Sequence, residues 1–137
     1  MWTNQSGEPK VKEGRPTRVL LVDDEPSVQQ VLARRLRANG YEVTTAEDGK
    51  EAIEKVGREH PDVVLLDIML PKMSGNAVAA ELHEKSETAN IPVIFITCLV
   101  NNNEARVMSY KLGGNRIMGK PIDNDDLIHL IEEATRT

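Results

Sequence analysis

The amino-acid sequence predicts an α/β fold in which a parallel sheet is covered by helices. From residue 18 onward, short apolar runs alternate with segments of helical periodicity, which is the pattern of repeated strand–helix units. The first apolar run is continuous rather than alternating with polar residues, as expected of a strand that is buried on both faces. The chain has 137 residues, a length typical of one domain with its own core.

The first strand–helix unit follows residue 18. Residues 19–22 (VLLV) form a continuous apolar run, which predicts a buried strand. Pro26 suits the first turn of the next helix, because a backbone N–H has no partner within the helix at that position. The helix is expected to end at Asn39-Gly40. Its buried positions, spaced at i, i+3, i+4 and i+8, are expected to be Val28, Val31, Leu32 and Leu36.

The second unit begins with a more polar strand at residues 41–46. Glutamate and threonine residues interrupt its apolar run, which predicts a place at the edge of the sheet. The segment Asp48-Gly-Lys-Glu51 is a capping box, and it predicts a helix that runs through His60. The inward positions of this helix are expected to be Ala52, Ile53 and Val56.

Three further units complete a pattern of five strands and five helices. The remaining strands are expected at residues 63–66, 92–96 and 116–118. A Pro/Gly loop is expected at residues 70–75. The helices are expected from the end of this loop to about residue 85, between Asn101 and Gly113, and from Asp123 onward. Residues 1–17 have no apolar period, which predicts a flexible N-terminal extension ahead of a domain at residues 18–137.

Composition excludes several classes of protein. The chain has 17 basic and 22 acidic residues and a net charge of −5, which disfavours direct binding of nucleic acid or anionic membranes. No apolar run approaches the roughly 18 residues that span a bilayer, and no signal peptide is evident. The single cysteine, Cys98, cannot form an internal disulfide, and no Cys/His cluster has zinc-site spacing. These features predict a cytoplasmic protein.

Polar side chains follow several of the predicted strands. In open parallel sheets, ligands bind beyond the carboxyl ends of the strands, which is where these side chains are expected to lie. Taken singly, such residues are ordinary helix caps or solvated charges. Their joint placement favours a functional site, because three carboxylates brought together repel one another unless a cation or proton offsets them. The residues concerned are Asp23, Asp24, Asp67, Thr97 and Lys120.

The residue types in this set suggest a chemistry. Carboxylates without His or Cys suit a hard cation such as Mg²⁺. A carboxylate can also accept a phosphoryl group, and such a transfer asks the protein mainly for positioning and charge neutralisation. Lys120 can supply positive charge, and Thr97 can donate a hydrogen bond to a phosphoryl oxygen.

The segments VLLVDDEP (19–26), VVLLDIMLPKMSG (63–75) and PVIFIT (92–97), with the Lys120-Pro121 pair, resemble a response regulator receiver domain of two-component signalling. The resemblance covers residues 18–136. It implies a flavodoxin-like, doubly wound, five-stranded parallel sheet with five helices. Its strand order, numbered along the chain, is expected to be 2-1-3-4-5.

The resemblance also implies a role for each site residue. Asp67 is the expected phosphoacceptor, and Asp24, Asp67 and the backbone carbonyl of Met69 are the expected ligands of Mg²⁺. Asp23 is expected to act largely through a metal-bound water. The residues expected to contact the phosphoryl group are Thr97 and Lys120, and the Lys120-Pro121 peptide is expected to be cis.

One position departs from the family pattern. Receiver domains commonly carry Tyr or Phe three residues before the lysine, where this chain has Ile117. Ordinary sequence drift and an output that does not use a rotating ring both remain open as explanations. The expected switch and interaction residues are Thr97, Ile117 and Pro121.

The leading functional prediction is a phosphoacceptor module that receives its phosphoryl group from a histidine kinase or phosphotransfer protein. It is not expected to be an enzyme beyond weak self-catalysed phosphorylation and dephosphorylation. The alternative is a degenerate receiver that binds proteins independently of phosphorylation. Output is expected to pass through a downstream effector or a missing output domain. The chain is expected to be either a stand-alone regulator or part of a longer protein. A monomer and a phosphorylation-dependent dimer both remain open.

Overall fold

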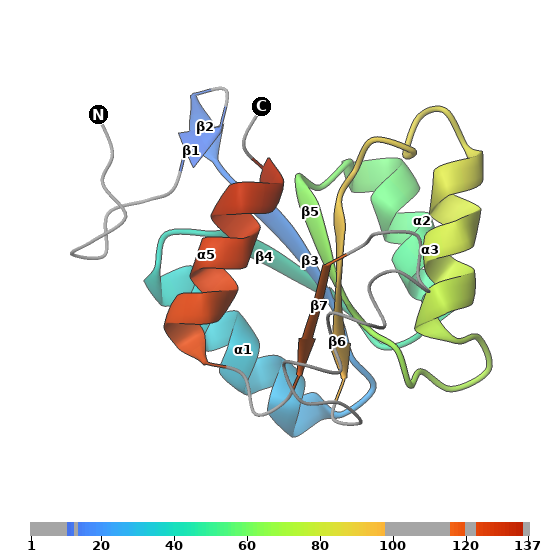
Figure 1. Cartoon of the computed structure of the whole chain (residues 1–137), viewed down its shortest axis with the longest axis horizontal. Helices are drawn as coiled ribbons and strands as arrows, with labels where there is room; N and C mark the ends of the chain where they lie inside the picture. Colours follow the sequence, from blue (N-terminus) through green and yellow to red (C-terminus); the bar gives the residue numbers. More distant parts are fainter. Residues whose placement is uncertain (1–10, 13, 98–115, 120–122, 136–137) are drawn as a thin grey trace.

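The computed structural model describes residues 11–12, 14–97, 116–119 and 123–135, and it confirms the flavodoxin-like α/β fold over them. The central sheet has five strands in the order β4-β3-β5-β6-β7, and every neighbouring pair is parallel (Figure 1). Along the chain this is the predicted order 2-1-3-4-5. The strands are β3 (Arg18–Val22), β4 (Glu42–Ala46), β5 (Val63–Asp67), β6 (Val93–Thr97) and β7 (Arg116–Gly119).

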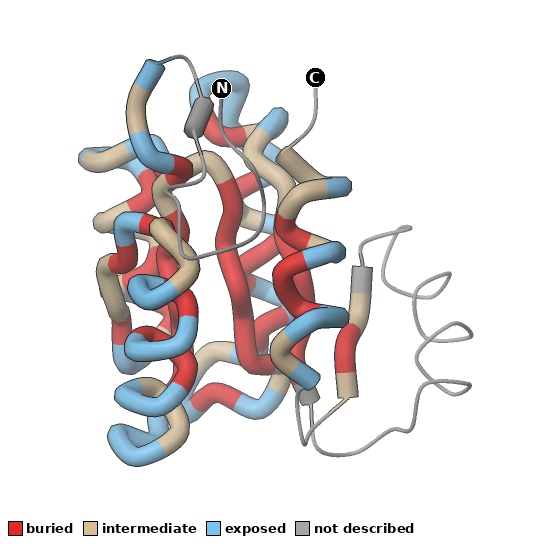
Figure 2. Tube along the Cα trace, turned by 90° about the vertical axis from the view of Figure 1, so that its left-hand side faces the viewer, coloured by how far each residue is buried: buried red, intermediate tan, exposed pale blue. Residues whose placement is uncertain are grey.

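Helices cover both faces of the sheet (Figures 1 and 2). On one face α1 (Pro26–Ala38) and α5 (Asn124–Thr135) pack over a core that includes Leu36 and Ile131. On the other face α2 (Gly49–Glu59) and α3 (Gly75–Glu84) enclose a second core. All five residues of β5 are buried, and its apolar run VVLL at residues 63–66 predicts a strand covered on both sides. The helix expected between Asn101 and Gly113 lies outside the described residues.

The prediction that Val31 is buried in α1 is wrong, because its side chain is 48% exposed. The buried stripe of α1 consists of Leu32, Ala33 and Leu36, with Val28 packed at its margin. At about 100° per residue, Val31 lies roughly 140° around the helix from Leu36. The i, i+3 spacing from Val28 predicts Val31 at one edge of the buried face. In the structure, Ala33 at the opposite edge is buried instead.

The predicted caps form at α2 and α5. The Asp48 carboxylate accepts a hydrogen bond from the Glu51 backbone N–H at 2.8 Å, and the Glu51 side chain accepts one from the Glu47 N–H at 2.7 Å. Asp123 accepts a hydrogen bond from the Asp126 N–H at 3.1 Å. These carboxylates satisfy backbone donors that have no partner within the first turn.

Strand β4 is the predicted edge strand, and side chains from both neighbouring helices cover its outer side. Its first and last residues hydrogen-bond toward the β3 side, through the Glu42 N–H and the Ala46 carbonyl. Residues 43 and 45 therefore point their backbone groups outward. Arg37 of α1 donates to the Val43 carbonyl at 3.0 Å, and Lys55 of α2 donates to the Thr45 carbonyl. Cations on the outward carbonyls oppose pairing with another strand.

Replacing both cations, Arg37→Ala with Lys55→Ala, is expected to make the protein self-associate in a concentration-dependent manner, because two edge carbonyls lose their donors. Sedimentation velocity measures this directly. The matched control is Arg34→Ala with Lys50→Ala, which removes the same charge from exposed positions of the same two helices. Equal self-association of the two double variants would show that charge, rather than the strand edge, controls solubility.

A short antiparallel hairpin precedes the sheet, formed by β1 (Val11–Lys12) and β2 (Arg15–Pro16). The Arg15 guanidinium makes two hydrogen bonds to the Asp62 carboxylate, at 2.9 and 3.1 Å, and the Arg18 N–H donates to the same carboxylate at 2.8 Å. The composition of residues 1–17 predicts a flexible extension, because the sequence contains no signal for a partner as distant as Asp62. The domain boundary at residue 18 stays a prediction.

Removing the Asp62 carboxylate is expected to destabilise the domain. Its side chain is 7% exposed, and Asp62→Ala removes the acceptor for all three hydrogen bonds, at an expected loss of about 2–3 kcal/mol in unfolding free energy. Asp62→Asn keeps an acceptor for the Arg18 N–H and should lose less. Urea unfolding measures both variants, and an Asp62→Ala midpoint equal to that of the wild type would contradict a stabilising role for this contact.

Candidate metal centre

Three carboxylates converge at the carboxyl ends of β3 and β5. The strands are adjacent and parallel, with Val22 opposite Leu66, so the residues that follow these two positions lie side by side. One carboxylate oxygen from each of Asp23, Asp24 and Asp67 lies within 4.8 Å of the others. Within the described ranges, this is the one group of three or more acidic, histidine or cysteine side chains that could hold a metal ion.

Two of the three carboxylates are oriented by the same kind of local contact, in which each accepts a hydrogen bond from the N–H two residues later. Asp23 accepts a hydrogen bond from the Glu25 N–H at 2.9 Å, and Asp67 accepts one from the Met69 N–H, also at 2.9 Å. Asp23 is 1% exposed and Asp67 is 5% exposed, whereas Asp24 is open to solvent. The site therefore has a rigid, buried pair of acids and a third acid at its entrance.

Gly75 supports the loop that follows Asp67. Its N–H donates to the Ile68 carbonyl at 3.0 Å, and the Ile68 N–H donates to the Ile96 carbonyl at 3.1 Å. A Cβ atom at Gly75 would lie 2.5 Å from the Asp67 carbonyl oxygen and 2.9 Å from the Ile68 Cα. No side chain fits in this position without moving the backbone of Asp67. In the sequence, Gly75 is recognisable only as the end of the loop at residues 70–75, and no motif there indicates this contact.

The other predicted site residues lie at the same edge of the sheet or outside the described residues. Thr97 ends β6, directly after the residue that pairs with Asp67, but its side chain is not among those described. Ile117 lies on β7 opposite Phe95, partly buried against the core beneath α2 and α3. Lys120 and Pro121 lie outside the described residues, immediately after the end of β7.

The donor set fits a hard divalent cation. It consists of oxygen atoms alone, which suits Mg²⁺ rather than a thiolate- or imidazole-seeking metal. Three like charges at this separation repel one another, and a bound cation would offset that repulsion. Met69 follows Asp67 by two residues, and its N–H donates to the Asp67 carboxylate at 2.9 Å, so its backbone lies beside the site.

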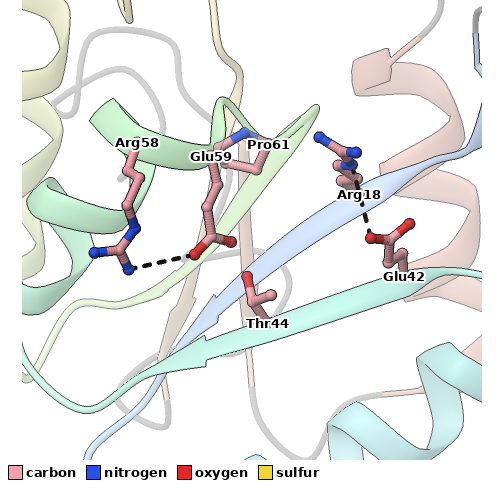
Figure 3. Close-up of a pocket in the computed structure, with 6 residues that line it drawn as sticks. All are labelled: Arg18, Glu42, Thr44, Arg58, Glu59 and Pro61. Atoms are coloured by element: carbon pink, nitrogen blue, oxygen red, sulfur yellow. Dashed lines mark ion pairs between the residues drawn. The ribbon is translucent and has the colours of Figure 1, made fainter.

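A separate hollow of about 370 Å³ lies at the opposite end of the sheet. Its lining includes Arg18 and Glu42, the first residues of β3 and β4 (Figure 3). The three acids lie instead at the carboxyl ends of β3 and β5. Two ion pairs border the hollow, Arg18–Glu42 at 3.8 Å and Arg58–Glu59 at 3.5 Å (Figure 3). This hollow is therefore not part of the acidic site.

The parallel sheet and the acids at its carboxyl edge define a known class of signalling domain. The family model for the response regulator receiver domain matches residues 19–132, and the chain belongs to that family. Receiver domains are signalling domains rather than classical enzymes, bind Mg²⁺ in their active site, and interact with histidine kinases and output domains.

No helix in the described part of the chain is long and apolar enough to cross a membrane.

Relatives with longer chains carry a similar segment. A probable transcriptional regulatory protein TcrX of Mycobacterium tuberculosis is 39% identical over 116 residues, which are 85% of this chain and 48% of that protein. The response regulator PleD of Caulobacter vibrioides is 37% identical over 119 residues, 87% of this chain and 26% of that protein. The chain thus spans about half the length of TcrX and about a quarter of PleD.

Solved structures agree with this assignment. The receiver domain of the sensor histidine kinase PA1611 from Pseudomonas aeruginosa has a TM-score of 0.78 and 27% identity, covering 88% of this chain and 98% of that one. That structure holds a magnesium ion coordinated in the active-site cleft. A putative response regulator from Chloroflexus aurantiacus has a TM-score of 0.82 and 25% identity, covering 90% of this chain and all of that one.

Proposed function

We propose that the domain accepts a phosphoryl group on Asp67, with Mg²⁺, from a histidine kinase or a phosphotransfer protein. The single observation that supports this most strongly is the convergence of Asp23, Asp24 and Asp67 within 4.8 Å at the carboxyl edge of a receiver fold. The interaction with the donor protein, and then with a downstream effector or output domain, would make the module a switch for protein contacts.

In the proposed transfer, a carboxylate oxygen of Asp67 forms a bond to phosphorus as the phosphorus–nitrogen bond of the donor's phosphohistidine breaks. The electron pair of that bond goes to the imidazole nitrogen, which becomes a neutral ring nitrogen or takes up a proton. The Met69 N–H holds one oxygen of the Asp67 carboxylate at 2.9 Å and so orients the group for attack. Such a reaction depends mainly on positioning and charge neutralisation.

Asp23, Asp24, Asp67 and the Met69 carbonyl are the residues that would hold Mg²⁺. The metal would neutralise charge on the phosphoryl oxygens when bound. Thr97 and Lys120 are proposed to contact the phosphoryl group, from the ends of β6 and β7. Thr97, Ile117 and Pro121 are the proposed switch residues, and an aliphatic side chain at Ile117 implies a switch without a rotating ring.

The test is to incubate the protein with phosphoramidate and Mg²⁺ and to measure its intact mass. The wild type is expected to gain one phosphoryl group, and Asp67→Asn is expected to gain none, because an amide is not a phosphoryl acceptor under these conditions. Chelation of Mg²⁺ should suppress the gain. If the wild type stays unlabelled with phosphoramidate and also with a phosphorylated donor protein, the phosphorylation-independent interaction module becomes the better explanation.

A further inference from the structure

Gln29 contacts the backbone of the acidic site without touching any of its carboxylates. It lies in the first half of α1, and its side-chain nitrogen donates to the Asp23 carbonyl at 3.2 Å and to the Ala46 carbonyl at 3.1 Å. Both partners are carbonyl oxygens, which only accept hydrogen bonds, so the NH₂ end of the amide must face them. Its two hydrogens allow both contacts at once.

These contacts fix the peptide group between the first two acids of the site. The Asp23 N–H donates to the Ala46 carbonyl at 3.1 Å, and the Asp23 carboxylate accepts from the Glu25 N–H at 2.9 Å. Gln29 adds the remaining constraint, because it holds the Asp23 carbonyl, which belongs to the same planar peptide as the Asp24 nitrogen. The direction in which the chain enters Asp24 therefore depends on this amide.

We infer that Gln29 is a positioning residue for the metal site: it ties the end of β3 to the end of β4 and so sets where Asp23 and Asp24 stand relative to Asp67. This inference rests on the proposed function, since it assumes that these acids bind Mg²⁺. Removing a residue that orients a metal ligand typically weakens metal binding by about 10- to 100-fold.

The test is the Mg²⁺ dissociation constant of the full chain, measured by isothermal titration calorimetry. Gln29→Met keeps the length of the side chain but removes both donors, and it is expected to weaken Mg²⁺ binding about tenfold. Gln29→Glu replaces the donors with oxygens that repel the two carbonyls, and it is expected to weaken binding at least as much. The matched control, Gln30→Met on the exposed face of the same helix, is expected to bind like the wild type.

A second readout separates positioning from general stability. The Gln29 variants are expected to reach the wild-type extent of phosphoramidate labelling at saturating Mg²⁺, with only the Mg²⁺ midpoint displaced. All titrations are made at a temperature where circular dichroism shows every variant to be folded. A variant that is merely less stable would keep the wild-type Mg²⁺ midpoint under these conditions.

The outcomes distinguish this inference from the proposed function. Wild-type Mg²⁺ affinity in both Gln29 variants, with normal labelling of the wild type, would overturn the role of Gln29 and leave the phosphoacceptor proposal intact. Absence of Mg²⁺ binding by the wild type would overturn both. Equal weakening in Gln29→Met and Gln30→Met would also overturn the inference, because only Gln29 contacts the backbone of the site.

Discussion

Gly75→Ala is expected to lower the unfolding free energy by about 3 kcal/mol, because the added Cβ collides with backbone that cannot move independently. The new atom would lie 2.5 Å from the Asp67 carbonyl oxygen and 2.9 Å from the Ile68 Cα. The adjoining Ile68 backbone is held by hydrogen bonds at 3.0 and 3.1 Å, to Gly75 and Ile96. The collision must therefore displace the segment that carries the proposed phosphoacceptor.

The same variant is expected to slow phosphoramidate labelling of Asp67 by about a hundredfold, since small misplacements of a reacting group have effects of that size. Urea unfolding and a labelling time course measure the two effects. Gly57→Ala is the control of opposite sign. A Cβ atom at Gly57, on the exposed face of α2, meets nothing within 4 Å, so alanine there should add about 0.5–1 kcal/mol of stability. A Gly75→Ala protein as stable and as reactive as the wild type would contradict the tight contact.

Asp24→Asn is expected to have opposite effects with and without Mg²⁺. Without the metal, the variant should melt at a higher temperature than the wild type, because one of three mutually repelling charges is gone. With the metal, the variant should gain less stability than the wild type, since the stabilisation by a ligand rises with the logarithm of its concentration divided by its dissociation constant. We expect Mg²⁺ binding to weaken at least tenfold, because losing a proposed ligand should cost no less than losing a residue that orients one.

Thermal unfolding of the wild type and Asp24→Asn over a series of Mg²⁺ concentrations measures both effects. Glu47→Gln is the matched control, because it removes one negative charge from an exposed position just beyond the carboxyl end of β4, outside the cluster. If Glu47→Gln and Asp24→Asn respond equally to Mg²⁺, the response reflects the overall charge of the domain. If Asp24→Asn melts below the wild type without Mg²⁺, the three carboxylates do not repel one another as proposed.

The strands were the most predictable part of the fold. A strand covered on both faces needs a continuous apolar run, and VVLL at residues 63–66 of β5 satisfies that requirement without knowledge of any neighbour. The buried side of α1 was less predictable. Val31 and Ala33 both fit a helical spacing, and only the packing of α1 against β3 and β4 decides between them.

Contacts between distant segments are the features that the sequence does not predict. Arg15 of the hairpin β1–β2 pairs with Asp62, and the composition of the N-terminal segment does not predict this pair. The acids of the site were predictable because they lie at the carboxyl ends of strands that apolar runs mark in the sequence. Gln29 and Gly75 act on backbone carbonyls of other segments, so their roles appear only once the chain is folded.

Locating the phosphoryl group tests the central claim most directly. The wild-type protein is labelled with phosphoramidate and Mg²⁺, or with a phosphorylated donor protein, and its peptides are then sequenced by mass spectrometry under conditions that preserve acyl phosphates. We predict one phosphoryl group, carried by Asp67 and by neither Asp23 nor Asp24. A stable phosphoryl group on another residue, or no label from either donor, would contradict the assignment of this site.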